Sequence, residues 1–392
     1  TNGSTWTEAA TSPLTDSHRV ALEPSATDAT TIYALTEGLA RDAQDRLIDP
    51  VHIYKTTNGF TTITATSLPN DADTGIPAKD FTRGQSFYDL VIEADATNDN
   101  IVYVGGIDLF KTTNGGTSWS QISKWSNNNN LAALGVSVVH ADQHSIAFGN
   151  NDSSKMLFGN DGGIYYSGNS GGTLNKRNKG YNVTQFVKAA IGPDGAGDVD
   201  GIFSAGAQDN GTQGFRNAVA GVNSSTEVSG GDGFYTFIDK DGQYMIATYT
   251  NNVIYRFNLP WNGMSRIQGG ATTLLNERTT GDFVNPMGYD SQANRLLTNA
   301  SGAAKSIKSI NVASNTKGNI TNALLDASPT AFQASPFTNN TWYVGLSNGK
   351  LLKLTNVANS NATWTNVVTP FVGSISSVRF GATEDDIFVT MH

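Results

Sequence analysis

Short apolar runs alternate with turn-rich stretches along almost the whole chain. In "VHIYKTTNGFTTITAT" (51–66) and "YDLVIEADATNDNIVYVGG" (88–106), β-branched and aromatic residues flank a turn built from Asn, Asp or Gly. Such runs are typical of β-strands, whereas a long apolar pattern of helical period is missing from the sequence. The pattern therefore predicts an all-β protein.

The same plan recurs about every 40 to 50 residues with four strands each time, which is typical of a β-propeller. We expect one propeller domain over 1–392. Its blades are predicted at about 18–66, 86–123, 144–178, 183–229, 233–268, 284–326 and 329–368.

The two ends of the sequence suggest how such a ring closes. Residues 374–392 supply only two strands, and 1–9 resemble a turn and a last strand. Because open sheet edges invite aggregation, we expect both ends to share a closing blade. That makes eight blades, or seven if two weaker units between 180 and 320 are one. Alternatively, the chain is a piece of a longer protein.

Composition narrows the classes of function. The net charge is −9 without a Lys/Arg cluster, which argues against nucleic-acid binding. A membrane-spanning helix needs about 18 apolar residues in a row, and no apolar run in the sequence approaches that length. The chain has no cysteine, so disulfides and thiolate chemistry are excluded. The Asn/Thr/Gly-rich, Lys-poor composition leads us to expect an extracellular protein or one on a bacterial cell surface.

The stretch "TTNGGTSW" (112–119) has the spacing of a hairpin clamp, and "SGNSGGTL" (167–174) repeats it. The Asn side chain accepts backbone N–H groups, the Gly adopts positive φ, and the aromatic residue packs between sheets. "TTNGFTTI" (56–63) is a degenerate copy, and "TNGSTW" (1–6) is one residue short. The predicted structural residues are Thr112, Asn114, Gly116, Ser118, Trp119, Ser167, Asn169, Gly171 and Thr173.

This stretch resembles the Asp-box of BNR-repeat propellers. The phrases "HADQHSIAF" (140–148), "GNDGGIYYS" (159–167), "AQDNGT" (207–212) and "GGDGFY" (230–235) also resemble secreted bacterial propellers of the glycosyl hydrolase-like or sortilin-like (VPS10-type) group. Family 74 xyloglucanases are distantly similar. The resemblance implies the propeller fold and a place in long surface proteins of Bacteroidota, but it identifies no catalytic Asp pair.

One loop face is the predicted ligand-binding site. In a propeller, the loops between strands two and three share a face with the loops between blades, and the four phrases above fall in such loops. The insertions 37–50 and 67–85 open there too. Ligand sites collect on loops of rigid scaffolds. The candidate residues are His140, Asp142, His144, Asn160, Asp161, Gln208, Asp209, Asn210 and Asp232.

Several chemistries fit these candidates. In an extended segment His140, Asp142 and His144 share a side, which suits a metal site, a substrate contact or simple bracing of the turn. The catalytic candidates are Asp142, Asp161, Asp209 and Asp232. A retaining glycosidase needs two carboxyl groups about 5–5.5 Å apart and an inverting one about 6.5–9.5 Å. The same carboxylates suit Ca²⁺, or serve as ordinary turn residues.

Aromatic side chains near this face are candidates for stacking on sugar rings: Trp125, Trp261 and Tyr166. Burial in the core is the alternative for each. We favour a secreted or surface module without a cofactor that binds a glycan or a protein. The alternatives are a glycoside hydrolase and a structural spacer of a larger adhesin.

Overall fold

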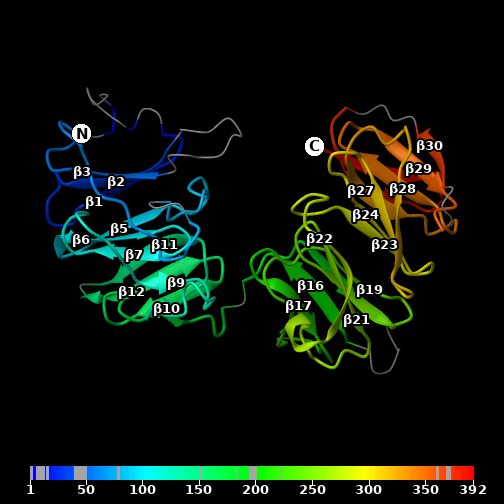
Figure 1. Ribbon diagram of the computed structural model, residues 1–392, viewed down its shortest axis with the longest axis horizontal. Helices are drawn as coiled ribbons and strands as arrows, with labels where there is room; N and C mark the ends of the chain where they lie inside the picture. Colours follow the sequence, from blue (N-terminus) through cyan, green and yellow to red (C-terminus); the bar gives the residue numbers. More distant parts are fainter. Residues whose placement is uncertain are drawn as a thin grey trace. The chain divides into compact units, whose positions relative to one another are not determined.

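A computed structural model describes residues 3–5, 14, 17–38, 51–76, 80–150, 152–181, 183–193, 201–221, 223–358, 362–367 and 372–392. The chain divides into two compact units, Thr1–Val183 (unit 1) and Thr184–His392 (unit 2), and each is described by itself (Figure 1).

Unit 1 contains three four-stranded sheets that follow one another along the unit (Figure 1). The first is β1 (Val20–Pro24), β2 (Ile32–Glu37), β3 (Val51–Thr56) and β4 (Thr64–Ala65). The second is β5 (Val91–Asp95), β6 (Asn98–Gly105), β7 (Leu109–Thr112) and β8 (Ser120–Gln121). The third is β11 (Gln143–Gly149), β12 (Asp152–Asn160), β13 (Gly163–Ser167) and β14 (Asn175–Lys176). Between the last two, β9 (Ser123–Lys124) pairs in parallel with β10 (Ser137–Val138).

Unit 2 contains four such sheets and a hairpin. The first two are β15 (Lys188–Ile191), β16 (Phe203–Ala207), β17 (Gly211–Phe215), β18 (Thr226–Ser229), and β19 (Thr236–Ile238), β20 (Tyr244–Thr248), β21 (Asn252–Asn258), β22 (Ala271–Glu277). The next two are β23 (Met287–Asp290), β24 (Arg295–Asn299), β25 (Ile307–Asn311), β26 (Thr316–Ile320), and β27 (Pro329–Ala334), β28 (Trp342–Leu346), β29 (Leu351–Thr355), β30 (Thr363–Val367). The hairpin is β31 (Ile375–Phe380) with β32 (Ile387–Met391).

The predicted all-β fold of four-stranded propeller blades is confirmed, because every four-stranded sheet is an antiparallel meander in chain order. Within the described ranges there are seven such blades, and the helical structure is one turn, η2 (Arg266–Gln268). In these ranges no helix is long and apolar enough to cross a membrane.

One predicted blade boundary differs from the structure, and one predicted strand is not covered by it. The fourth strand of the fifth blade, β22, ends at Glu277, beyond the expected 268, since η2 and its flanks occupy the connection. The predicted N-terminal strand at 1–9 lies outside the described residues except for 3–5, so the shared closing blade stays a prediction.

Each apolar core fills the space between two neighbouring sheets. In β6, Val102 and Val104 contact the cluster shared with the first sheet, whereas Tyr103 between them contacts the third sheet. In β20 of unit 2, Met245 and Ile246 face two different cores in the same way. Because successive strand residues point to opposite faces, a strand buried on both faces is apolar throughout. This explains the continuous apolar runs of the second strands.

Close approach of neighbouring sheets depends on glycine at the end of a second strand. A Cβ at Gly345 of β28 would lie 2.3 Å from Cγ2 of Ile375, and one at Gly105 of β6 would lie 2.6 Å from Cβ of Gln143. Both distances are shorter than a van der Waals contact, so a larger residue would push the next sheet away.

Candidate functional site

The two complete Asp-box-like turns in unit 1 have the same hydrogen bonds. The Thr112 hydroxyl donates to Asn114 Oδ1 (2.9 Å), which also accepts the Ser118 N–H (2.9 Å). In the second turn, Asn169 Oδ1 accepts from the Ser167 hydroxyl (2.9 Å) and the Thr173 N–H (2.8 Å). These side chains thus close the turn between the third and fourth strands of a blade.

The degenerate turn at 56–63 adopts the same arrangement. Asn58 Oδ1 accepts from the Thr56 hydroxyl (3.1 Å) and the Thr62 N–H (2.8 Å). Phe60 occupies the place of Gly116 and has φ +68°. The Asn therefore holds this turn although the left-handed position lacks its glycine. The short copy at 1–6 lies outside the described residues except for 3–5.

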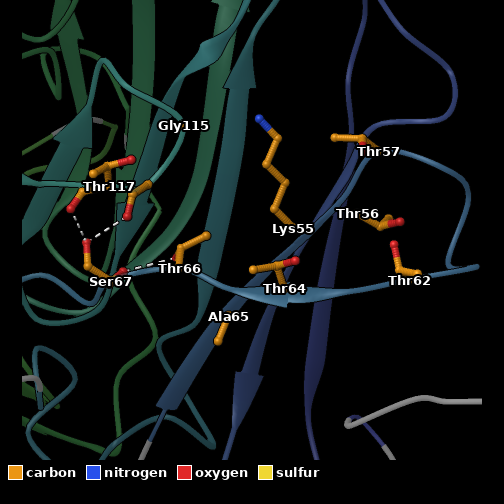
Figure 2. Close-up of a pocket in the computed structure, with 11 residues that line it drawn as sticks. Lys55, Thr56, Thr57, Thr62, Thr64, Ala65, Thr66, Ser67, Gly115 and Thr117 are labelled. Carbon is orange, nitrogen blue, oxygen red and sulfur yellow. Dashed lines mark hydrogen bonds between the residues drawn. The ribbon is translucent and has the colours of Figure 1, made fainter.

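A pocket of about 460 Å³ lies between the turns of the first two blades (Figure 2). Ser67, shown beside Thr117 in Figure 2, donates to the carbonyls of Gly116 (2.6 Å) and Thr117 (2.7 Å). The Thr66 hydroxyl donates to the carbonyl of Ile53 (3.2 Å). The Ser67 hydroxyl thus joins the first blade to the second, whereas the Thr66 hydroxyl bonds within the first blade. The pocket is at the ends of the blades that carry the third-to-fourth strand turns, and not at the carboxylates of the predicted face.

The predicted face of unit 1 brings His144 and Asp161 together. His144 Nε2 lies 2.7 Å from Asp161 Oδ1, and the Tyr88 hydroxyl donates to Asp161 Oδ2 at 3.0 Å. The rings of Tyr88 and His144 meet edge to face, with centroids 4.8 Å apart. Three segments far apart in sequence thus converge on one carboxylate: the turn before β5, the start of β11 and the turn after β12.

The aromatic part of this site was not predicted. Phe87 is 64% exposed and Tyr88 is 42% exposed. Arg19 holds their backbone by donating to the Phe87 carbonyl (2.9 Å). The signal available in the sequence was "SFYDL", an adjacent Phe and Tyr between the insertion 67–85 and the strand β5.

The expected extended segment at 140–144 is interrupted. Asp142 has φ +64°, a left-handed turn conformation, so the alternation assumed for His140, Asp142 and His144 fails there. His140 lies at a different contact, its Nδ1 3.2 Å from the Ala141 carbonyl oxygen. A Cβ at Gly162 would lie 2.3 Å from Cγ of His140, so this ring packs directly on the turn after β12.

The predicted residue Asn160 connects the loops together with Gln143, which was not predicted. Gln143 Nε2 donates to the His140 carbonyl (2.6 Å), and Asn160 Nδ2 donates to Gln143 Oε1 (3.3 Å). Asn160 Oδ1 accepts the Gly162 N–H (3.1 Å). Asn160 therefore shapes the turn that presents Asp161.

Asp142 and Asp161 have carboxylate oxygens within 4.8 Å of each other. Asp142 is 8% exposed, and Asp161 accepts from Tyr88 and His144. Asp142 is therefore nearly closed to solvent, whereas both carboxyl groups of a glycosidase have to reach the sugar. A calcium site at these carboxylates stays a prediction.

Asp89 is a buried acid that the sequence reading missed. It is 0% exposed, and neither carboxylate oxygen has a hydrogen-bond partner on another described residue. Burial raises its pKa to about 9, and the negative charge of Asp142 adds to the shift. At neutral pH Asp89 is therefore a neutral carboxylic acid, next to Tyr88 in the chain.

In unit 2, the predicted residues lie in two segments that contact each other. Asp232 Oδ1 accepts the Asp209 N–H (3.2 Å), and the carbonyl of Asn210 accepts from Gln213 Nε2 (2.7 Å). Asp209 has φ +60°, and the Gln208 carbonyl accepts the Asn210 N–H (2.7 Å). These contacts brace the turn after β16 against the segment before β19.

The two predicted insertions and the three aromatic candidates differ in how far the structure supports them. In 67–85, Arg83 pairs with Asp71 (2.7 Å) and with Asp73 (3.4 Å). Residues 39–50 of the other insertion lie outside the described residues. Trp125 is exposed with Arg83 over its ring, whereas Trp261 is 4% exposed and cannot stack on a ligand in this structure. Tyr166 is partly buried beside Arg177.

Comparison with known proteins adds little. No family model and no curated protein matches the chain. Among solved structures, one chain of a mitotic checkpoint complex has 12% identity and a TM-score of 0.40, with 78% of this chain and 84% of that chain covered. Sqt1 from Chaetomium thermophilum has 11% identity and a TM-score of 0.39, with 95% of each chain covered. Similarity this low supports no statement about function.

Proposed function

We propose that the chain is a non-catalytic binding module that takes a neutral glycan through Phe87, Tyr88, His144 and Asp161, here called the Tyr88 surface. The observation that carries the proposal is the exposed aromatic pair beside a carboxylate whose position is set by two donors.

This combination matches the chemistry of sugars. The apolar face of a pyranose ring packs on an aromatic side chain, and its hydroxyls donate to carboxylates. Phe87 offers the larger exposed aromatic surface, and Asp161 offers the acceptor. Because Tyr88 and His144 already orient Asp161, little side-chain entropy is lost on binding.

Binding is favoured over hydrolysis by the burial of the carboxylate nearest to Asp161. Asp142 is 8% exposed, so Asp161 has no open partner for the two-carboxyl mechanism of a glycosidase. The resemblance to BNR-repeat propellers supports a glycan ligand and an extracellular or cell-surface location, and both belong to the proposal.

The test is affinity electrophoresis through gels that contain xyloglucan, laminarin or cellulose derivatives, with reducing ends assayed in parallel. We expect at least one polysaccharide to retard the wild-type chain without release of reducing ends. Phe87→Ala should weaken that binding at least fivefold. Phe388→Ala is the matched control, because Phe388 is a similarly exposed Phe in unit 2.

Three results would contradict the proposal. Release of reducing ends that Asp161→Asn abolishes would instead establish a hydrolase. Retardation that Phe87→Ala leaves unchanged would place the glycan elsewhere. No retardation by any of the polysaccharides would favour a structural spacer or a protein-binding module.

A further inference from the structure

Unit 2 has a pocket of about 400 Å³ along the first strands of its sheets, β15, β19, β23, β27 and β31. The charged residues that line it are Lys188 and Arg379, and its aromatic lining includes Phe237 and Tyr289. No acidic side chain is among the lining residues that the structure describes. In a chain of net charge −9, a pocket with only cations stands out.

Lys188 has no counter-ion among the described residues. Its ammonium lies 5.8 Å from the ring centroid of Tyr235 and 5.9 Å from that of Phe237, on the next sheet. Within the described ranges it has neither a hydrogen bond nor an ion pair. Burial lowers the pKa of Lys188, and the Arg379 charge lowers it further. Among the described residues, the contacts of this positive charge are therefore with aromatic rings.

Arg379 also has no acidic partner among the described residues. Its Nη1 donates to Gln333 Oε1 (2.8 Å) and to the Val378 carbonyl (2.8 Å). Its other N–H groups have no partner in the part of the chain that the structure describes. A guanidinium offers five donors in a planar fork that suits a carboxylate.

The acid behind the pocket cannot neutralise these cations. Asp239 is buried, and its Oδ1 accepts from the hydroxyls of Tyr289 (3.1 Å) and Ser291 (2.6 Å). Its Oδ2 accepts the N–H groups of Asp241 and Gln243, both at 3.2 Å. Since this carboxylate is engaged by four donors, it leaves the two cations available to an anionic ligand.

We infer that unit 2 contains a second binding site, which holds the carboxylate of an acidic sugar between Lys188 and Arg379. Phe237 and Tyr289 line the same pocket. The volume is within the range of about 300–1,000 Å³ of small-molecule sites. The two cations bind the carboxylate, and the rings of Phe237 and Tyr289, which are tilted 53° to each other, offer apolar surface to a pyranose ring. This site is separate from the Tyr88 surface and does not depend on the function proposed above.

The test is calorimetric titration of the full chain with D-glucuronate, and with D-glucose as the uncharged analogue. We expect glucuronate to bind and glucose to bind at least tenfold more weakly. Lys188→Met and Arg379→Gln should each weaken glucuronate binding at least tenfold, and Lys188→Arg should restore most of it. Lys353→Met is the matched control, because Lys353 also lies over a tyrosine ring in unit 2 but pairs with Glu384.

D-Galacturonate and its polymer polygalacturonate, titrated beside glucuronate, distinguish a free sugar from a residue in a polymer. Binding of either monomer supports a site for free acid sugars. Binding of the polymer alone, if lost in Lys188→Met, supports the same site within a chain. The inference is overturned if glucose binds as tightly as glucuronate, if none of the acids binds, or if folded Lys188→Met and Arg379→Gln bind like wild type. Phe87→Ala should leave glucuronate binding intact, so this inference can fail or hold independently of the proposed function.

Discussion

At the scale of single residues, the Asx-type turns show which local rules were sufficient. Asn114, Asn169 and Asn58 each accept the bonds that their spacing predicts, because an Asx side chain reaches only its own turn. For Asp89, local rules were not sufficient. An acid ahead of an apolar strand looks like a surface residue until the fold buries it.

Replacement of Asp89 by asparagine tests its protonation. The folded pKa of about 9 lies above the unfolded value of about 3.9, so the folded state binds the proton more tightly. Stability from this group is complete below the unfolded pKa and is lost as pH rises toward 9. Asn is neutral at every pH. Asp89→Asn should therefore match wild type near pH 4 and exceed it increasingly, by up to about 1.4 kcal/mol for each pH unit.

Urea denaturation at several pH values between 4 and 9 measures this difference. Asp28→Asn is the control: Asp28 is exposed, and its hydrogen bonds to Thr30 lower its pKa, so no growing advantage is expected above pH 5. A constant offset between Asp89→Asn and wild type would show that Asp89 is ionised in the folded state.

At the scale of strands, a repeated tyrosine–lysine pair joins the second and third strands of three blades. Tyr33 faces Lys55, Tyr103 faces Lys111, and Tyr343 faces Lys353 across the ladders. The ammonium lies 5.1, 5.1 and 5.4 Å from the ring centroid in the three pairs. Cross-strand pairs of this kind stabilise sheets, and the hydroxyls of the first two tyrosines also reach the next blade.

Tyr103→Phe isolates that contact between blades. The Tyr103 hydroxyl donates to the Ser170 carbonyl (3.0 Å) in the Asp-box-like turn of the third blade. Lys111 Nζ donates to the same carbonyl (3.0 Å), so the acceptor keeps one partner. We expect a loss of about 1 kcal/mol in the free energy of unfolding. Urea denaturation measures it, with Tyr181→Phe, an exposed tyrosine, as control; equal stability of the two variants would contradict the prediction.

At the scale of the whole molecule, the carboxyl groups with a shifted pKa are unevenly distributed between the two units. All the carboxyl groups with a raised pKa in the described ranges lie in unit 1: Glu23, Asp89, Glu93 and Asp108. Burial is the main cause in each. In unit 2 the shifted carboxyls, Asp326 and Glu384, have a lowered pKa.

Rising pH should therefore lower the stability of unit 1 and leave that of unit 2 unchanged. Glu93 and Asp108 have a pKa of about 7, so between pH 6 and pH 8.5 their neutral forms are lost in the folded state. Hydrogen–deuterium exchange, corrected for intrinsic rates, should show falling protection in β5–β7 and steady protection in β20, β21 and β24. An equal change in both units would contradict this prediction.

The sequence by itself determined the elements and their order. Strand runs and turn residues report short-range physics, so the blades and the hydrogen bonds of the Asx turns could be predicted from spacing alone. Only the tertiary structure decided the chemistry of the surfaces. Desolvation of Asp89, the meeting of Tyr88 with Asp161, and the presence of Lys188 and Arg379 at one pocket all depend on residues from different blades. Burial and charge balance are properties of three-dimensional neighbours, and local sequence does not contain them.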